Sequence, residues 1–411
     1  MGRLSVMPAM SGLRSAHDVA AFRREFPGLA RRVHLASCSL GARSARLDAA
    51  IGEMLDASAG PDAWHAFEEQ TDLVRHGAAA LLGARTAQVA LMPNASTGAY
   101  QVASTFRWQR RPRLITTVTE FPSIAHVWLA QRPLGAEVVF VGDARTGTVC
   151  ADDYLAAIDD RAALVSVPAT TYRDGTRLPV AAIAAAAHAA GAKVIVDAYQ
   201  AVGVEPVQVN ALRCDYLIAG FSKYLLGLPG AAMLYARAPQ DGDRDPQLTG
   251  WFGRVRPFAF DQRLDFPPEA RRFETGTPAV PAMYAATAGL SLIAQLNLNV
   301  VRQHVQDLVA YAAEQLRAQG ETVRLSSNPN ARGAHVPVLD RDPAALAAWL
   351  AARHITVSPR GEVMRLSVHA YTSRTDIDEV CVGIRAYRRR VGAPVARRPD
   401  MGMHTLIGGR R

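Results

Sequence analysis

The chain is 411 residues long, 49% of them hydrophobic, and its formal net charge is +9. This composition suits an ordinary globular protein, and the length favours two or three domains. No apolar run approaches 18 residues and the first residues lack the apolar region of a signal peptide, so neither a membrane span nor secretion is expected. The four cysteines lie far apart without a Cys-x-x-Cys pair, which argues against a metal site or a disulfide framework and favours a reduced, cytoplasmic setting.

The positive charge comes almost entirely from arginine, because only two of the 46 basic side chains are lysines, Lys193 and Lys223. Two arginine-rich stretches, residues 107–113 and 385–390, have two interpretations. They form either a nucleic-acid patch or the solvated face of a helix. No nucleic-acid-binding motif accompanies them, so we favour the solvated face and expect no nucleic-acid partner.

Short β-branched runs alternate with alanine-rich helical runs through the middle of the sequence. Strands are expected at residues 89–93, 113–120, 137–143, 163–170, 193–198, 216–221 and 231–237, and helices at 152–160 and 180–191. Strand, helix, strand at this spacing predicts an α/β domain with a mostly parallel, seven-stranded sheet. Ligands of such sheets lie at the carboxyl ends of the strands, which is where Asp197 and Lys223 fall.

The pattern changes after about residue 281, where long helical stretches lead into short strands and predict a smaller α+β domain. Four parts are therefore expected. Residues 1–60 form an N-terminal segment that packs with the small domain, 61–285 the large domain, 286–392 the C-terminal small domain, and 393–411 a loose tail.

Lys223 stands in the segment "GFSKYLLG", between apolar runs, in a protein that otherwise uses arginine. An arginine cannot replace a lysine where the amine must lose its proton and attack a carbonyl. Lys223 is therefore the candidate for a Schiff base, and pyridoxal phosphate is the common carbonyl cofactor. Lys193 is interpreted as a surface lysine.

Pyridoxal phosphate also needs a carboxylate for its pyridine nitrogen and donors for its phosphate. Asp197 ends a predicted strand 26 positions before Lys223, and a buried carboxylate there needs a cationic partner. The alternative is a helix N-cap. Ser96 and Thr97, in "NASTGAYQVAS", open a predicted helix after a strand, where anions bind; the alternative is plain capping.

These residues carry a family resemblance. The segments "DAYQ" and "GFSKYLLG" resemble the class V aminotransferase group of fold-type-I pyridoxal-phosphate enzymes. Five further segments are similar to kynureninase motifs: "VHLASCSLGARS", "EFPS", "TTYRDG", "LTGWFGR" and "RRFETGTPAV". The likeness covers roughly residues 20 to 390, and the spacing between the motifs is kept.

The resemblance implies a role for each matching residue. Lys223 bonds the cofactor and Asp197 pairs with its pyridine nitrogen. Cofactor contacts are implied for Ser96, Thr97, Phe121, Tyr172, Gln200, Ser222, Trp251 and Thr277. Arg365 would bind the substrate carboxylate, as a planar fork suits, and Ser39 would lie near the substrate.

The resemblance also implies a homodimer, because Thr277 would reach the partner's cofactor. Phe121 and Trp251 also have simple packing interpretations, and Arg365 could be a surface cation. Substrate contacts are further expected from residues 37–39, from residues 64–67 and from the partner subunit.

Four departures from the kynureninase pattern bear on the reaction. Gln200 stands where those enzymes have His, Ser222 where they have Tyr, Ile124 where they have Asp and Cys38 where they have Asn. These changes alter hydrogen bonding around the ring and the substrate. Kynurenine hydrolysis itself is therefore not assured by the motifs.

The leading hypothesis is an amino-acid enzyme that forms a Cα carbanion and then cleaves a C–C or C–X bond in the side chain of its substrate. The alternatives are a class V aminotransferase, an isopenicillin-N-epimerase-like enzyme and a non-catalytic cofactor-binding regulator. A persulfide-forming cysteine desulfurase is disfavoured because residues 319–365, where its nucleophile is expected, contain no cysteine. A C–S lyase that needs no cysteine stays open.

Overall fold

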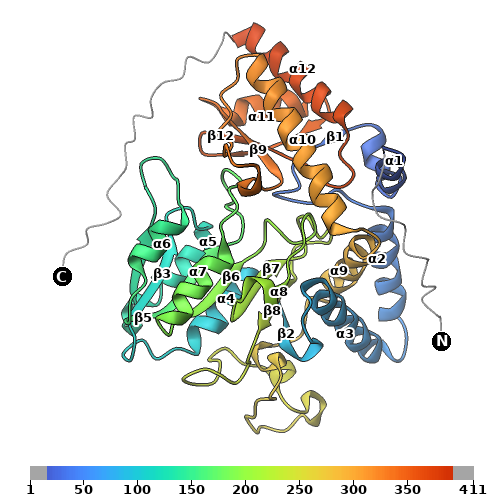
Figure 1. Cartoon of the computed structure of the whole chain (residues 1–411). Helices are drawn as coiled ribbons and strands as arrows, with labels where there is room; N and C mark the ends of the chain where they lie inside the picture. The colour runs from blue at the N-terminus through green and yellow to red at the C-terminus, as the bar shows by residue number, and fades with distance from the viewer. Residues whose placement is uncertain (1–15, 392–411) are drawn as a thin grey trace.

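The computed structural model describes residues 16–391 and shows two domains built around separate sheets (Figure 1). The larger sheet has seven strands in the order β2-β8-β7-β6-β5-β3-β4. They are β2 (Val89–Met92), β3 (Arg113–Thr117), β4 (Glu137–Val141), β5 (Ala162–Pro168), β6 (Lys193–Asp197), β7 (Tyr216–Gly220) and β8 (Ala232–Ala236). Only β8 runs antiparallel to its neighbours. The predicted mostly parallel, seven-stranded sheet is confirmed.

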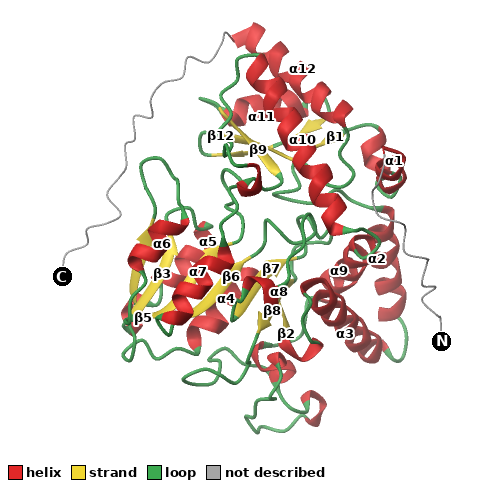
Figure 2. Ribbon diagram, in the orientation of Figure 1, coloured by secondary structure: helices red, strands yellow, loops and turns green. Residues whose placement is uncertain are grey.

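The strands of this sheet are apolar because helices cover both of its faces (Figure 2). The helices are α4 (Ala95–Ser104), α5 (Pro122–Leu129), α6 (Ala151–Ala157), α7 (Val180–Ala189) and α8 (Val209–Leu212). Successive residues of β6 point to opposite faces. Val194 belongs to the core that contains Ile183 of α7, whereas Ile195 belongs to the core that contains Trp128 of α5.

Three helices pack together beside the large sheet (Figure 1). They are α2 (Ala45–Ser58), α3 (Ala63–Leu82) and α9 (Val280–Ile293), and α9 contacts both of the others. Leu47 of α2 and Ala285 of α9 share a small apolar cluster. Within residues 16–391, no single helix is long and apolar enough to cross a membrane, and α9 with α10 meets that test only as a pair bent by 85°.

The small domain holds a three-stranded antiparallel sheet in the order β11-β12-β9. Its elements are α10 (Leu298–Ala318), β9 (His335–Leu339), α11 (Pro343–Ala351), β10 (Ile355–Thr356), β11 (Ser358–Arg360), β12 (Val363–Ser367) and α12 (Arg374–Val391). The long helices α10 and α12 pack against each other. This sheet carries Arg365 at the centre of β12, with Pro337 of β9 opposite.

The N-terminal segment divides its contacts between the two domains. Helix α1 (Ala16–Arg23) joins the small domain through an ion pair of Arg23 with Asp376 at 2.7 Å. Strand β1 (Val33–His34) pairs in parallel with β10. Helix α2 instead packs on α9. The predicted tail at residues 393–411 lies outside the described residues.

Candidate active site

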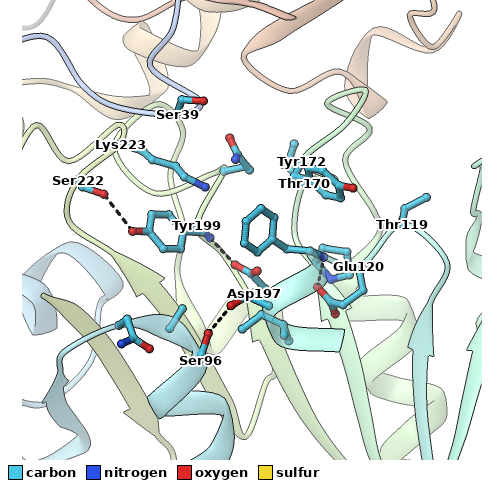
Figure 3. A pocket seen from close by; sticks show the side chains of 17 residues that line it. Ser39, Ser96, Thr119, Glu120, Thr170, Tyr172, Asp197, Tyr199, Ser222 and Lys223 are labelled. Atoms are coloured by element: carbon cyan, nitrogen blue, oxygen red, sulfur yellow. Dashed lines mark hydrogen bonds between the residues drawn. The ribbon is translucent and has the colours of Figure 1, made fainter. Parts of the chain in front are cut away.

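A cavity of about 220 Å³ opens at the carboxyl ends of the large sheet (Figure 3). It is lined by residues that follow three neighbouring parallel strands: Glu120 and Phe121 after β3, Thr170 and Tyr172 after β5, and Asp197 at the end of β6. This is the position that the parallel sheet predicts for a ligand. Eight residues for which the sequence implied a contact with the cofactor or the substrate line this one cavity: Ser39, Ser96, Phe121, Tyr172, Asp197, Gln200, Ser222 and Lys223.

The segment that carries Lys223 is fixed by close backbone packing. A Cβ atom added at Gly41 would overlap the carbonyl oxygen of Lys223, and one added at Gly289 would overlap that of Leu225. Two distant segments, the loop before α2 and the middle of α9, therefore press directly on this segment. Such contacts hold the lysine backbone in one place without any side chain between them.

Burial lowers the pKa of the Lys223 amine to about 8, against an attraction to Asp197 that raises it. The nearby guanidinium of Arg365 lowers it further. The Nζ atom lies 4.0 Å from the ring centroid of Tyr199 and 5.4 Å from that of Phe121. An amine with this pKa is neutral in about a tenth of molecules at pH 7, which suits a nucleophile. Lys193, by contrast, is paired with Asp241 at the surface, as expected for the other lysine.

Asp197 and Glu120 form a buried pair of carboxyl groups. Asp197 Oδ1 accepts a hydrogen bond from the Tyr199 backbone N–H at 2.9 Å. Burial raises the Asp197 pKa, although this hydrogen bond and Lys223 oppose the rise. Burial and the Asp197 charge raise the Glu120 pKa to about 7. No helix starts at Asp197, so the N-cap alternative does not describe it.

Glu120 is held by three donors. Its Oε1 accepts from the Phe121 backbone N–H at 2.9 Å, and its Oε2 accepts from the hydroxyls of Ser166 and Thr116 at 3.0 and 3.1 Å. Asp197 has no such set of side-chain donors among the described residues. A buried carboxylate in this position fits a protonated ring nitrogen as its partner.

The amino end of α4 forms one side of the cavity. Asn94 is the N-cap, and its Oδ1 accepts from the Thr97 backbone N–H at 2.9 Å. The hydroxyls of Ser96 and Ser123 lie 2.7 Å apart on the cavity wall. The Thr97 hydroxyl is bonded to Asn94 at 3.1 Å and does not line the cavity. A phosphate at this helix end would therefore meet Ser96 rather than the Thr97 side chain.

Arg365 is fully buried and contacts two residues of the cavity wall, Tyr172 and Ser39. Its Nη1 donates to the Tyr172 carbonyl at 2.6 Å, and its Nη2 donates to the hydroxyls of Ser358 and Ser39 at 2.7 and 3.2 Å. No carboxylate in residues 16–391 forms an ion pair with Arg365. The guanidinium is thus a desolvated cation held by neutral groups, which favours a carboxylate ligand over the surface-cation interpretation.

Two residues named from the sequence lie away from this cavity. Trp251 packs in an aromatic cluster with Trp64 and Phe258, at centroid distances of 5.8 and 5.2 Å. Thr277 lines a separate, smaller cavity with Glu274. A single subunit therefore does not bring these two residues to Lys223.

The four departures lie at or beside the cavity. Ile124 and Gln200 line it. The Gln200 Nε2 donates to the Cys38 carbonyl at 3.1 Å, while its buried Oε1 has no partner among the described residues. Ser222 pairs through its hydroxyl with Tyr199 at 3.1 Å.

Glu120 and Tyr199 were not singled out from the sequence, although both lie in strand-end segments that were. Glu120 directly precedes Phe121, and Tyr199 stands two positions after Asp197. A rule that inspects every polar or aromatic side chain at the carboxyl ends of parallel strands would have found them. Ser358 offered no such signal, because it lies in the other domain.

A buried lysine, a buried carboxylate, a helix amino end and an unpaired guanidinium meet at the carboxyl ends of this sheet, which is the arrangement expected of a fold-type-I pyridoxal-phosphate enzyme. The class V aminotransferase family model matches residues 56–380. The protein belongs to this family, which confirms the predicted fold and the predicted cofactor.

Individual relatives carry several activities. The sequence is 33% identical to the uncharacterized aminotransferase YcbU of Bacillus subtilis over 89% of its own length and 98% of that protein. It is 28% identical to a kynureninase of Pseudomonas fluorescens over 79% and 81%. Its fold is similar to that of a cysteine desulfurase from Thermococcus onnurineus, with a TM-score of 0.81, 20% identity and coverage of 93% and 100%.

Proposed function

We propose that this enzyme acts on an α-amino acid and cleaves a bond of its side chain. The observation that carries the proposal is Arg365, a buried cation with no carboxylate partner among the described residues, which lies near enough to Lys223 to lower its pKa and contacts Ser39 on the cavity wall. An α-amino acid supplies the missing carboxylate, and its amino group and Cα then face the lysine. The likeness to kynureninases supports the cleavage step.

Each residue has a physical task in this proposal. Arg365 and Ser39 bind the substrate carboxylate and fix the direction of the Cα–H bond. The neutral amine of Lys223 accepts the Cα proton as a general base. Pyridoxal phosphate, when bound, withdraws electrons from Cα, and the carboxylate of Asp197 keeps the pyridine nitrogen protonated. Glu120, with a pKa of about 7, is partly protonated at neutral pH and so limits the negative charge next to Asp197.

Amino transfer is the second candidate, and the likeness to YcbU along nearly its whole length supports it. An isopenicillin-N-epimerase-like reaction uses the same first proton removal. A persulfide-forming desulfurase is not favoured. None of the four cysteines is among the described residues that line the cavity, and Cys38, Cys214 and Cys381 are buried. A C–S lyase without a cysteine nucleophile needs only the groups named above.

The test is to incubate the purified, cofactor-loaded enzyme with L-kynurenine and identify the products by mass and fluorescence. Anthranilate and alanine would support C–C cleavage, and kynurenic acid would support amino transfer. The same assay with cystine, read as pyruvate and ammonia, tests C–S cleavage. Absence of every cleavage product across a panel of amino acids, from a protein that still makes an amino-transfer product, would refute the cleavage proposal.

We also propose a homodimer with shared active sites. Phe260 and Trp64, whose rings lie 5.7 and 5.8 Å from that of Trp251, expose 76% and 49% of their surface, and Leu264 exposes 65%. Exposed apolar groups gathered in this way favour a protein partner, and a second copy would also place Thr277 near a neighbouring cavity. Sedimentation of the enzyme tests the mass of the assembly, and Phe260→Asp should yield monomers that lose activity.

We further propose a cytoplasmic location. All four cysteines are free thiols, which suits a reducing compartment.

A further inference from the structure

Tyr199 is the aromatic residue closest to the amine of Lys223. The Nζ atom lies 4.0 Å from its ring centroid, compared with 5.4 Å for Phe121. Figure 3 shows the Tyr199 ring below the Lys223 amine and beside Asp197, with its hydroxyl directed toward Ser222. A planar ring bonded to Nζ would therefore lie within contact range of both aromatic side chains.

Gly220 creates the space that Tyr199 occupies. A Cβ atom added to this last residue of β7 would overlap the Tyr199 phenol ring and its hydroxyl. The backbone of Gly220 has no positive φ that would require glycine. The missing side chain is thus explained by the approach of the phenol ring, and Gly220 and Tyr199 form one structural unit.

The Tyr199 hydroxyl makes a hydrogen bond of 3.1 Å with the Ser222 hydroxyl. Ser222 precedes Lys223 and lines the same cavity. Burial raises the pKa of Tyr199, so the phenol keeps its proton and can donate it in this hydrogen bond. The ring and the hydroxyl therefore act on two different neighbours: the ring on the space next to Lys223, and the hydroxyl on Ser222.

We propose that Tyr199 is a cofactor-positioning residue that forms the second aromatic wall of the ring slot, facing the cofactor together with Phe121. Its hydroxyl holds Ser222 in one rotamer at the edge of that slot. The inference rests on the proposed role of Lys223 as the residue that bonds the cofactor. Stacking on a second aromatic face adds about 1 to 1.4 kcal/mol, which corresponds to roughly a five- to tenfold gain in affinity for pyridoxal phosphate.

The test compares Tyr199→Leu, which fills the space without an aromatic face, with Tyr199→Phe, which keeps the face and removes the hydroxyl. The readouts are the dissociation constant of pyridoxal phosphate and the visible absorbance spectrum of the bound cofactor. We expect Tyr199→Leu to weaken binding about five- to tenfold and Tyr199→Phe to stay within about twofold. Tyr387→Leu, in helix α12, is the matched control and should bind as the wild type does.

Gly220→Ala moves the phenol without changing it, and should weaken cofactor binding in the same direction as Tyr199→Leu. Thermal unfolding shows whether Tyr199→Leu is folded. If it is not, Gly220→Ala tests the same role of Tyr199. Wild-type affinity in a folded Tyr199→Leu or Gly220→Ala protein would overturn the inference alone. Failure of the wild-type protein to bond pyridoxal phosphate at Lys223 would instead overturn the proposed function.

Discussion

The lowered pKa of Lys223 makes a quantitative prediction about its reactivity. A pKa of about 8 in place of 10.5 raises the neutral fraction at pH 7 from about one in 3,000 to about one in ten, roughly a 300-fold gain. The reaction rate of this amine in the cofactor-free protein should therefore rise about tenfold between pH 6 and 7 and level off above about pH 8.

Lys193→Arg isolates the measurement, because Lys223 is then the only lysine in the sequence. The assay labels the amine at a series of pH values and quantifies the modified peptide by mass. Asp197→Asn should move the midpoint down, because Asp197 raises the Lys223 pKa, and Arg365→Met should move it up. A midpoint above about pH 10, or no response to either substitution, would refute the electrostatic account of this site.

Four further results are expected. The free energy of unfolding of the cofactor-free protein should increase as the pH rises from about 8 to about 10.5, because only the unfolded state binds the Lys223 proton in that range. Lys223→Met should remove this increase in denaturation experiments at a series of pH values. Glu120 has the opposite effect: the free energy of unfolding should decrease as the pH rises from about 4.5 to 7, because in that range only the folded state keeps the Glu120 proton. Glu120→Gln should remove this decrease. In steady-state kinetics, Arg365→Met should raise KM for an amino acid about 100-fold. Arg365→Lys should bind the substrate little better than Arg365→Met, because a lysine lacks the planar fork. Gly289→Ala should lower the melting temperature and release cofactor, since its Cβ meets the Leu225 carbonyl; unchanged melting would contradict the packing argument.

The large sheet, and several of the functional candidates at the ends of its strands, could be predicted from the sequence. Continuous β-branched runs between alanine-rich helices predict strands that are covered on both faces of the sheet. The parallel strands β5 and β6 are buried in this way. Asp197 and Lys223 were found because their residue types are chemically costly or unusual where they stand. That kind of signal is local, so it survives without knowledge of the fold.

Features that depend on contact between distant segments were not predicted. The packing of Gly41 and Gly289 on the Lys223 segment, and of Gly220 on Tyr199, has no periodic pattern in the sequence. Thr97 was grouped with Ser96, but the capping geometry turns its hydroxyl to Asn94. Such details follow from rotamers and backbone approach, which residue spacing does not report.

The proposed function depends on a covalent bond between Lys223 and the cofactor. Borohydride reduction of the enzyme loaded with pyridoxal phosphate, followed by tryptic digestion, tests it directly. The cofactor mass is expected on one peptide, residues 214–237, which stays uncleaved at Lys223 because the amine is blocked. Cofactor mass on residues 178–213, which carry Lys193, or an unmodified Lys223 in a protein that retains the cofactor, would contradict it.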